Sequence, residues 1–160
     1  MPRWAAGGAC NAAAMLVRDV MSRDPVTIAP DAPLRAAAEL MRERRVRHLP
    51  VVGPEGRLLG VLTDRDLRHM AFRPALAELL PSTPALARPA RVRDAMTWAA
   101  ITVGPDLPLA RAGLVMIERR IGSLPVVEDG RLVGILTDHD LLRALPPAGQ
   151  RAAELAGFLW

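Results

Sequence analysis

The sequence of 160 residues contains no lysine and no tyrosine, and its only cysteine is Cys10. A single cysteine excludes an intramolecular disulfide, and the composition is typical of a reducing compartment. Aromatic residues make up 3% of the chain and are scattered, which argues against a base-stacking platform for nucleic acid. No apolar run approaches the roughly 20 residues of a membrane span. We therefore expect a cytoplasmic protein that neither spans a membrane nor binds specific nucleic acid.

The positive charge comes entirely from arginine. There are 21 basic and 17 acidic residues, which leaves a net charge of +4 and a pI near 11.0. The high pI reflects guanidinium groups that are always protonated rather than a large charge excess. Binding to nucleic acid should therefore be weak and salt-dependent at most. The hydrophobic fraction of 51% and the charged fraction of 24% are those of an ordinary globular protein.

Sequence motifs of the common enzyme classes are absent. The patterns G-x-S-x-G, H-E-x-x-H and the P-loop do not occur, and the three histidines have no metal-ligand spacing. Asp64 with Asp66, and Asp138 with Asp140, are paired carboxylates that would suit Mg²⁺ held together with the phosphates of a nucleotide. The first carboxylate of each pair is more simply explained as a solvent-facing helix residue. We predict that the protein is not an enzyme.

The chain contains two copies of one unit. When residues 17–53 are aligned with residues 92–128, and residues 56–70 with residues 130–144, 27 of the 52 aligned positions are identical. The matched segments include VRDVM with VRDAM, PDAPL with PDLPL, and GRLLGVLTDRDL with GRLVGILTDHDL. Such a duplication predicts two similar structural units related by an internal pseudo-twofold axis.

Each unit is expected to follow the order β-α-β-β-α. Residues 26–28 and 101–103 are β-branched and precede a proline, which is typical of a short strand. Asp31 and Asp106 occupy the position of an N-cap ahead of a helix with one apolar stripe. The remaining elements are two hairpins (residues 46–52 with 57–62, and 121–127 with 131–136), each followed by a helix from Thr63 or Thr137. The predicted fold class is α/β, of the α+β type, with sheet packed on sheet and helices outside.

The predicted organisation has five parts. They are a flexible tail (residues 1–16), the first repeat (17–71), a proline-rich linker (72–91), the second repeat (92–145) and a C-terminal tail (146–160). Ala152, Leu155, Ala156 and Leu159 have helical spacing, which predicts a short amphipathic helix in the C-terminal tail.

A T-x-x-D motif follows the second hairpin strand of each unit. Thr63 with Asp66, and Thr137 with Asp140, match a capping box, and a carboxylate near a helix N-terminus is also favoured by the helix dipole. Local structure therefore explains the motif without a ligand. However, a helix N-terminus also suits a phosphate, and a carboxylate can accept hydrogen bonds from both hydroxyls of a ribose. Capping and ligand binding are compatible.

Given these segments in both copies, the chain resembles a tandem pair of CBS domains, the Bateman module, from about residue 17 to residue 145. The resemblance implies a compact, usually homodimeric module that binds AMP, ADP, ATP, S-adenosylmethionine or NAD in clefts between the repeats. Such a module regulates a partner protein and does not catalyse a reaction. No cofactor would be obligatory, and the regulatory ligand would be an adenine nucleotide, with Mg²⁺ where phosphates require it, or S-adenosylmethionine.

The resemblance also implies ligand-binding roles for residues of both copies. Asp66 and Asp140 would hold the ribose, Thr63 and Thr137 would approach the phosphate, and Arg65 and His139 would reach toward phosphates. The adenine would lie against Val26 or Ile101, and against the segments from His48 to Pro50 and from Ser123 to Pro125. A proline within a strand marks an edge or a bulge, which suits backbone that faces a ligand. Packing alone explains Pro50 and Pro125 equally well.

The two copies differ in charge around the expected clefts. The residues concerned are Arg45, Arg47, His48 and Arg65 in the first copy, and Gly122, Ser123 and His139 in the second. Because guanidinium groups suit phosphate oxygens, the first cleft is expected to accept more phosphate charge, unless these arginines form only a solvated face. Trp98 replaces Arg23 and is expected either to cover the second cleft or to fill a gap.

Two functions remain open from the sequence. The first is a nucleotide-sensing regulatory module whose ligand changes its shape or its dimer, and through it an unidentified partner. The second is a dimerisation or scaffold module that binds no ligand. The presence of both the threonine and the aspartate in each copy favours the first.

Overall fold

The chain is represented by a computed structural model that describes residues 15–77 and 89–144. Its elements are α1 (Val17–Val20), β1 (Ser22–Arg23), α2 (Leu34–Arg44), β2 (His48–Val52), the 3₁₀ turn η2 (Pro54–Gly56), β3 (Leu58–Thr63), α3 (Asp64–Ala77), the 3₁₀ turn η4 (Val92–Asp94), β4 (Thr97–Trp98), α4 (Leu109–Arg119), β5 (Ser123–Glu128), β6 (Arg131–Thr137) and α5 (Asp138–Ala144). The two repeats share one succession of elements, which begins with a short helical turn that the sequence analysis did not predict.

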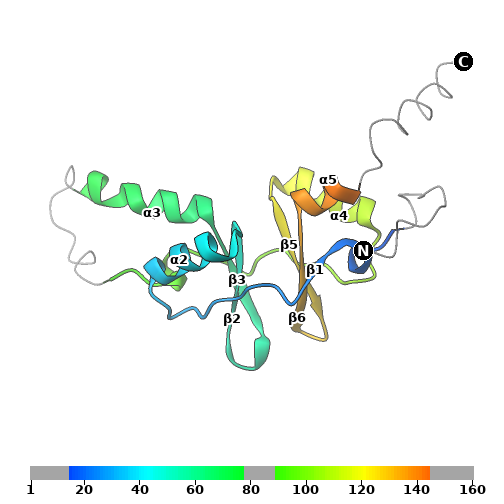
Figure 1. The fold of residues 1–160 in the computed structure, drawn as a ribbon, viewed down its shortest axis with the longest axis horizontal. Coiled ribbons are helices and arrows are strands. Elements are labelled where there is room, and N and C mark those ends of the chain that lie inside the picture. The colour runs from blue at the N-terminus through cyan, green and yellow to red at the C-terminus, as the bar shows by residue number, and fades with distance from the viewer. Residues whose placement is uncertain (1–14, 78–88, 145–160) are drawn as a thin grey trace, which may run out of the picture.

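Two three-stranded sheets form the centre of the molecule (Figure 1). The strand order is β2-β3-β4 in one sheet and β1-β6-β5 in the other. Helices α2 and α3 lie outside the first sheet, and α4 and α5 lie outside the second. The predicted α+β architecture, with sheets inside and helices outside, is confirmed.

A β-hairpin forms the main part of each sheet. β2 pairs with β3, and β5 pairs with β6, both antiparallel. Each pairing has a bulge, between Val51 and Val52 in the first hairpin and between Val126 and Val127 in the second. The turn of the second hairpin has positive φ at Asp129 (50°) and Gly130 (77°), the conformation of a type I′ turn. β2 and β5 are edge strands, as the proline in each predicts.

The first segment of each repeat pairs with the other repeat. β1 is antiparallel to β6, and β4 is antiparallel to β3. The amide of Val17 donates to the carbonyl of Leu107 at 2.9 Å, and the amide of Val92 donates to the carbonyl of Ala32 at 3.0 Å. Each sheet is therefore completed by a strand of the other repeat, an exchange that the sequence analysis did not predict.

The two hydrophobic cores also combine residues of both repeats. Val17 is fully buried in the core that contains Leu124 of the second repeat. Val92 is fully buried in the core that contains Leu49 and Leu62 of the first repeat. Burying a valine fully contributes about 1.5–3 kcal/mol, so the stability of each half depends on the valine that the other repeat supplies.

Gly60 permits the close approach of β4 to β3. A Cβ atom at this position would overlap the carbonyl oxygen of Thr97, which belongs to the exchanged strand. Any side chain would therefore push β4 away from its partner.

The short strands predicted at residues 26–28 and 101–103 are not formed. Only Ile28 and Val103 make a parallel bridge, to Val51 and Val126. The ladder does not continue because the proline two residues later, Pro30 or Pro105, has no N–H group to donate.

Asp31 and Asp106 are not helix N-caps, contrary to the prediction. Helices α2 and α4 begin directly after Pro33 and Pro108, without a side-chain cap. The two carboxylates instead form ion pairs with the exchanged segments. Asp31 lies 2.5 Å from Arg93, and Asp106 lies 2.5 Å from Arg18.

The described elements extend beyond the predicted repeat boundaries. Helix α3 continues to Ala77, so the first part of the predicted linker is helical. Met15, placed in the predicted tail, accepts a hydrogen bond from the amide of Leu109 at 2.8 Å. The rest of the predicted tails and linker lies outside the described residues, including the pattern of Ala152, Leu155, Ala156 and Leu159. No helix within residues 15–77 and 89–144 is long and apolar enough to cross a bilayer.

Candidate functional site

Thr63 and Asp66 close the start of α3. The backbone N–H and the hydroxyl of Thr63 both donate to Oδ2 of Asp66, at 2.8 and 2.7 Å. The N–H of Asp66 donates back to Oγ1 of Thr63 at 3.3 Å. This is the capping box that the sequence predicts. The second carboxylate oxygen, Oδ1, accepts no hydrogen bond from the described residues.

Thr137 and Asp140 repeat this geometry at the start of α5. The N–H and the hydroxyl of Thr137 donate to Oδ2 of Asp140 at 2.9 and 2.7 Å, and the N–H of Asp140 donates to Oγ1 of Thr137 at 3.3 Å. In both copies the hydroxyl proton points to the carboxylate. The predicted donation from threonine to a phosphate therefore requires this hydroxyl to rotate away from the aspartate.

The strands bring other predicted residues next to these caps. His48 is the register partner of Thr63, and Ser123 is the register partner of Thr137. The carbonyl of Pro50 accepts the N–H of Ile28 at 3.1 Å, which holds residues 26–28 beside β2. Pro125 and Val103 make the same bond at 3.1 Å. We define the first site as Val26, His48, Pro50, Thr63 and Asp66, and the second site as Ile101, Ser123, Pro125, Thr137 and Asp140.

The residues expected to contact adenine differ in exposure. Val26 is half-buried against the core of the first sheet, whereas Ile101 is 40% exposed. The side chains of Pro50 and Pro125 are fully buried. Their side chains pack in the core, and their carbonyls accept the N–H groups of Ile28 and Val103, so these prolines position residues 26–28 and 101–103 rather than offering a surface of their own.

Arg47 and His48 of the first repeat reach toward the second repeat. Nη2 of Arg47 lies 3.8 Å from Oδ1 of Asp138, the first residue of α5. Nε2 of His48 and Oδ2 of Asp138 each lie 3.5 Å from the position that a Cβ atom would take at Gly122. Arg47 and His48, which the sequence analysis places around the first site, therefore also approach the second repeat. Both lie beside the start of α5, because Gly122 leaves room for them.

Burial lowers the pKa of His48 below its ordinary value of 6.5. The carboxylates of Asp138, Asp64 and Asp66 act in the opposite direction, and Arg47 adds to the lowering. The net shift is downward, so the imidazole is neutral at neutral pH. A neutral imidazole can accept or donate one hydrogen bond at the junction of the two repeats.

The predicted phosphate-facing residues Arg65 and His139 are exposed. Neither side chain forms an ion pair with the described residues, so both are available to a ligand. Asp64 is engaged with Arg68 at 3.1 Å. The described part of the chain holds no group of three or more His, Cys, Asp or Glu side chains suited to a metal ion. A Mg²⁺ ion would therefore require ligand phosphates.

Trp98 lies in β4, in the sheet of the first repeat, and is 56% exposed. Its register partner is Gly60. This exposure is inconsistent with the expectation that it fills a gap. The pairing of β4 with β3 does not place the Trp98 side chain over the second site.

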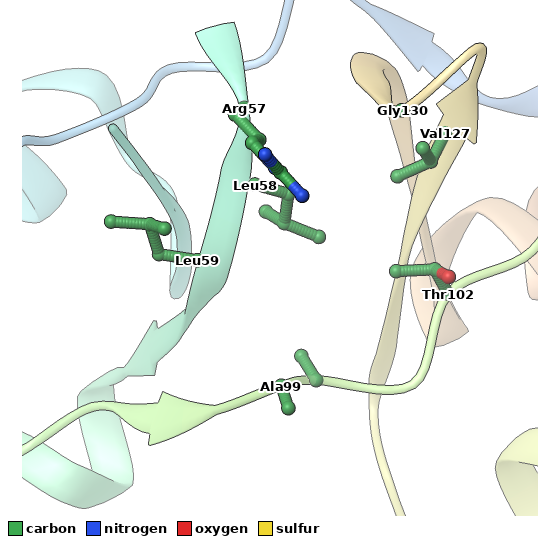
Figure 2. A pocket seen from close by; sticks show the side chains of 8 residues that line it. Arg57, Leu58, Leu59, Ala99, Thr102, Val127 and Gly130 are labelled. Atoms are coloured by element: carbon green, nitrogen blue, oxygen red, sulfur yellow. The ribbon is translucent and has the colours of Figure 1, made fainter. Parts of the chain in front are cut away.

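A cavity of about 210 Å³ lies between the two repeats (Figure 2). Its lining residues are Arg57, Leu58, Leu59, Ala99, Ala100, Thr102, Val127 and Gly130. None of the predicted site residues lines it, although Ala100 and Thr102 flank Ile101. Leu58 and Leu59 precede Thr63 by five and four residues, so the cavity lies roughly 13–17 Å along β3 from the cap.

Comparison with known proteins decides the family. The family model of the CBS domain matches residues 17–72 and 92–147. The chain belongs to the CBS-domain family. Each match contains one of the two caps, so the pair of sites corresponds to a pair of CBS domains.

Relatives with CBS domains match most of the chain. A CBS domain-containing protein of Dictyostelium discoideum is 34% identical over 132 residues, which cover 82% of this chain and 91% of the relative. The crystal structure of CBSX2 in complex with AMP has a TM-score of 0.70 at 31% identity, and it covers 86% of this chain and 98% of that chain. The CBS domain pair of MJ0100, in complex with 5'-methylthioadenosine and S-adenosyl-L-methionine, has a TM-score of 0.67 at 30% identity, covering 81% and 94%.

The lining of the cavity between the CBS domains was missed from the sequence. Arg57 and Arg131 form an antiparallel bridge where the two repeats meet, next to this cavity. The sequence does contain a feature at this point, because the segment GRL, which includes Arg57 and Arg131, occurs in both copies. Contact between the copies at this point depends on tertiary packing, which the repeat pattern does not specify.

Proposed function

We propose that this CBS pair is a regulatory module that binds an adenosyl ligand at its two sites. The observation that carries the proposal is the fixed carboxylate in each repeat. Asp66 and Asp140 are each held by three hydrogen bonds with threonine, and Oδ1 remains uncommitted among the described residues. A ribose presents two adjacent hydroxyl groups, and such a carboxylate can accept the hydrogen bonds that they donate. AMP, 5'-methylthioadenosine and S-adenosyl-L-methionine, the ligands of the two similar structures, share this ribose.

Apolar and charged groups around each carboxylate suit the rest of the ligand. Ile101 is a large apolar side chain that is 40% exposed, and a base stacked on it would remove this surface from water. The start of α3 offers backbone N–H groups to an anion, which favours a phosphate next to Thr63. The ligand would therefore lie with its base against residues 26–28 or 101–103 and its phosphate at the cap.

The distribution of arginine predicts different phosphate binding at the two sites. The first site has the exposed Arg65, whereas the second has His139 at the equivalent position. Arg47 compensates by placing its guanidinium beside Asp138 of the second repeat. A phosphate at the second site would compete with Asp138 for Arg47. Ligands with several phosphates would thus engage both repeats at once, with Mg²⁺ entering only together with the phosphates.

The exchanged strands provide a route from the ligand to a partner protein. Residues 26–28 follow β1, which belongs to the sheet of the second repeat, and residues 101–103 follow β4 in the sheet of the first. A ligand that binds one arrangement of these segments more tightly than another shifts the whole module toward it. The regulated partner would recognise that arrangement.

Thermal unfolding with and without AMP, ATP and S-adenosylmethionine tests the proposal. A ligand at about 100 times its dissociation constant raises the free energy of unfolding by about 2.7 kcal/mol. We expect at least one of these ligands to raise the melting temperature, and a nucleoside without the ribose 2'-hydroxyl to have less effect. If none of them changes the melting temperature, the module is a scaffold that binds no adenosyl ligand.

A further inference from the structure

Two arginines lie opposite each other where the hairpins of the two repeats meet. Arg57 and Arg131 form an antiparallel bridge, and both side chains are exposed. Residues opposite each other in such a bridge have their Cβ atoms about 4.5–5.5 Å apart on the same face, and like charges in this arrangement are destabilising. An anion bound between the two guanidinium groups would remove this repulsion.

The carboxylates of the hairpin ends do not neutralise the arginine pair. They are Glu55 and Asp129 in the turns, and Glu128, which is the register partner of Arg131. Neither Arg57 nor Arg131 forms an ion pair with these or any other of the described residues. Both guanidinium groups are therefore available to an anion from solution.

The cavity between the repeats adjoins the arginine pair (Figure 2). Arg57 lines it and points into the space between the hairpins, and Leu58, Leu59 and Val127 supply apolar walls. A cavity of about 150 Å³ holds a benzene ring, so the volume of about 210 Å³ has room for a small aromatic or alkyl group. A bound molecule would have its anionic end at the arginines and its apolar end in the cavity.

Ala99, in the wall of the cavity, occupies a position whose backbone favours another residue type. Its φ is 49°, in the left-handed region that is costly for alanine, and its amide donates to the carbonyl of Leu59 at 3.0 Å. The first repeat has Asp24 at the equivalent position, with φ of 51°, and aspartate tolerates this conformation better. The alanine therefore costs stability, but it keeps a carboxylate out of the cavity wall.

We propose that Arg57, Arg131 and the adjoining cavity bind a phosphate monoester that carries a small apolar group. Such a phosphate has a charge of about −1.5 to −2 at pH 7, which matches two guanidinium groups, and its oxygens accept paired hydrogen bonds from arginine. This site is separate from the two caps and does not depend on adenosyl binding there. Its ligand would contact both hairpins and hold the two repeats together.

NMR titration of the isotope-labelled full chain with phenyl phosphate tests the site. We expect the amide resonances of Leu58 and Gly130 to shift as the ligand binds. Arg57→Ala and Arg131→Ala should each weaken binding roughly tenfold or more, because each removes charge-assisted hydrogen bonds. Arg111→Ala removes another exposed arginine, in α4, and is the matched control that should leave the affinity unchanged.

Substitutions of Ala99 test the cavity wall without loss of folding. Ala99→Asp introduces the residue of the first repeat and should weaken phenyl phosphate binding several-fold, because its carboxylate repels the phosphate. Ala99→Asn is the neutral control. Both residues suit the left-handed backbone, so both variants should melt no lower than the wild type. Equal phenyl phosphate affinity in the two variants would contradict a phosphate at this wall.

The double variant Asp66→Asn/Asp140→Asn distinguishes this site from the two caps. It should bind phenyl phosphate as tightly as the wild type does. Loss of binding in the double variant, unchanged affinity in Arg57→Ala and Arg131→Ala, or no binding by the wild type would each overturn the proposal.

Discussion

In the proposed binding mode, Asp66 and Asp140 would each use their two carboxylate oxygens for different purposes. Oδ2 accepts two hydrogen bonds from threonine and orients the group, and Oδ1, which accepts none from the described residues, would accept from the ligand. An asparagine at either position can keep its oxygen toward the threonine and present its NH₂ group in place of Oδ1. The cap and the ligand contact can therefore be separated by one substitution, which removes the negative charge and one acceptor.

His48 is expected to make stability depend on pH. Burial lowers its folded-state pKa, so between 6.5 and that lower value the unfolded chain binds more protons than the folded chain. The free energy of unfolding should fall as the pH is lowered through this window and level off below it. His48→Ser, which introduces the residue found at the equivalent Ser123, should remove this loss.

Urea unfolding of the wild type and His48→Ser at a series of pH values between 7 and about 5 measures the difference. If the substitution removes packing contacts, His48→Ser should be less stable than the wild type at pH 7. The two curves of stability against pH should then converge toward pH 5. Parallel curves would contradict a role for His48 in this pH dependence.

Helices α2 and α4 each end at a residue with strained backbone. Arg45 and Arg120 follow these helices in the left-handed region, each with φ of 54°. The amide of Arg45 still donates to the carbonyls of the last turn, so the helix end is satisfied although its residue type is unfavourable. Both copies have arginine at this position, so the steric cost of the left-handed conformation occurs twice.

Arg45→Gly is expected to stabilise the protein by about 0.5–1 kcal/mol. Glycine adopts the left-handed conformation without the steric penalty, although its greater freedom in the unfolded chain offsets part of the gain. Arg44→Gly is the matched control, since it lies inside α2 and should destabilise by up to about 1 kcal/mol. Chemical unfolding of both variants gives the comparison, and a loss of stability in Arg45→Gly would show that its side chain contributes more than its backbone costs.

The sequence predicted those elements whose signals are local. The hairpins and the caps of α3 and α5 follow from strand patterns, from glycine in the turns and from the T-x-x-D motif. The N-cap prediction for Asp31 failed because the same residue type also forms ion pairs, and Arg93 of the exchanged segment is close by. Whether such an aspartate caps a helix or forms an ion pair depends on which partner lies nearer in the folded protein. The local sequence does not give that distance.

The exchange of segments makes the whole molecule one folding unit. β1 and β4 have two residues each, which is too short for any periodicity, so their pairing with the other repeat could not be predicted from the sequence. The sequence did show that two units exist and that they are related by pseudo-symmetry. It also predicted that a threonine and an aspartate would lie together at the start of α3 and of α5, but not that Arg47 would approach the second repeat.

Val17→Ala should destabilise both sheets together. Val17 belongs to the first repeat and is fully buried in the core of the second, so its truncation should cost about 2 kcal/mol. Because each core contains residues of both repeats, we expect one unfolding transition and an equal loss of protection in both sheets. Hydrogen exchange at the amides of Leu62 and Leu136 measures this, and a loss confined to the sheet of Leu136 would contradict a single folding unit.

The most direct test of ligand binding is titration calorimetry of AMP into the wild type, Asp66→Asn and Asp140→Asn. Each substitution should remove a charge-assisted hydrogen bond worth roughly 1.5–3 kcal/mol, which is about a tenfold or greater loss of affinity at its own site. The free energy of unfolding should change by no more than about 1 kcal/mol, because the threonine hydroxyl continues to cap the helix. Equal AMP affinity in all three proteins, or lower stability with no AMP binding in any of them, would contradict the account.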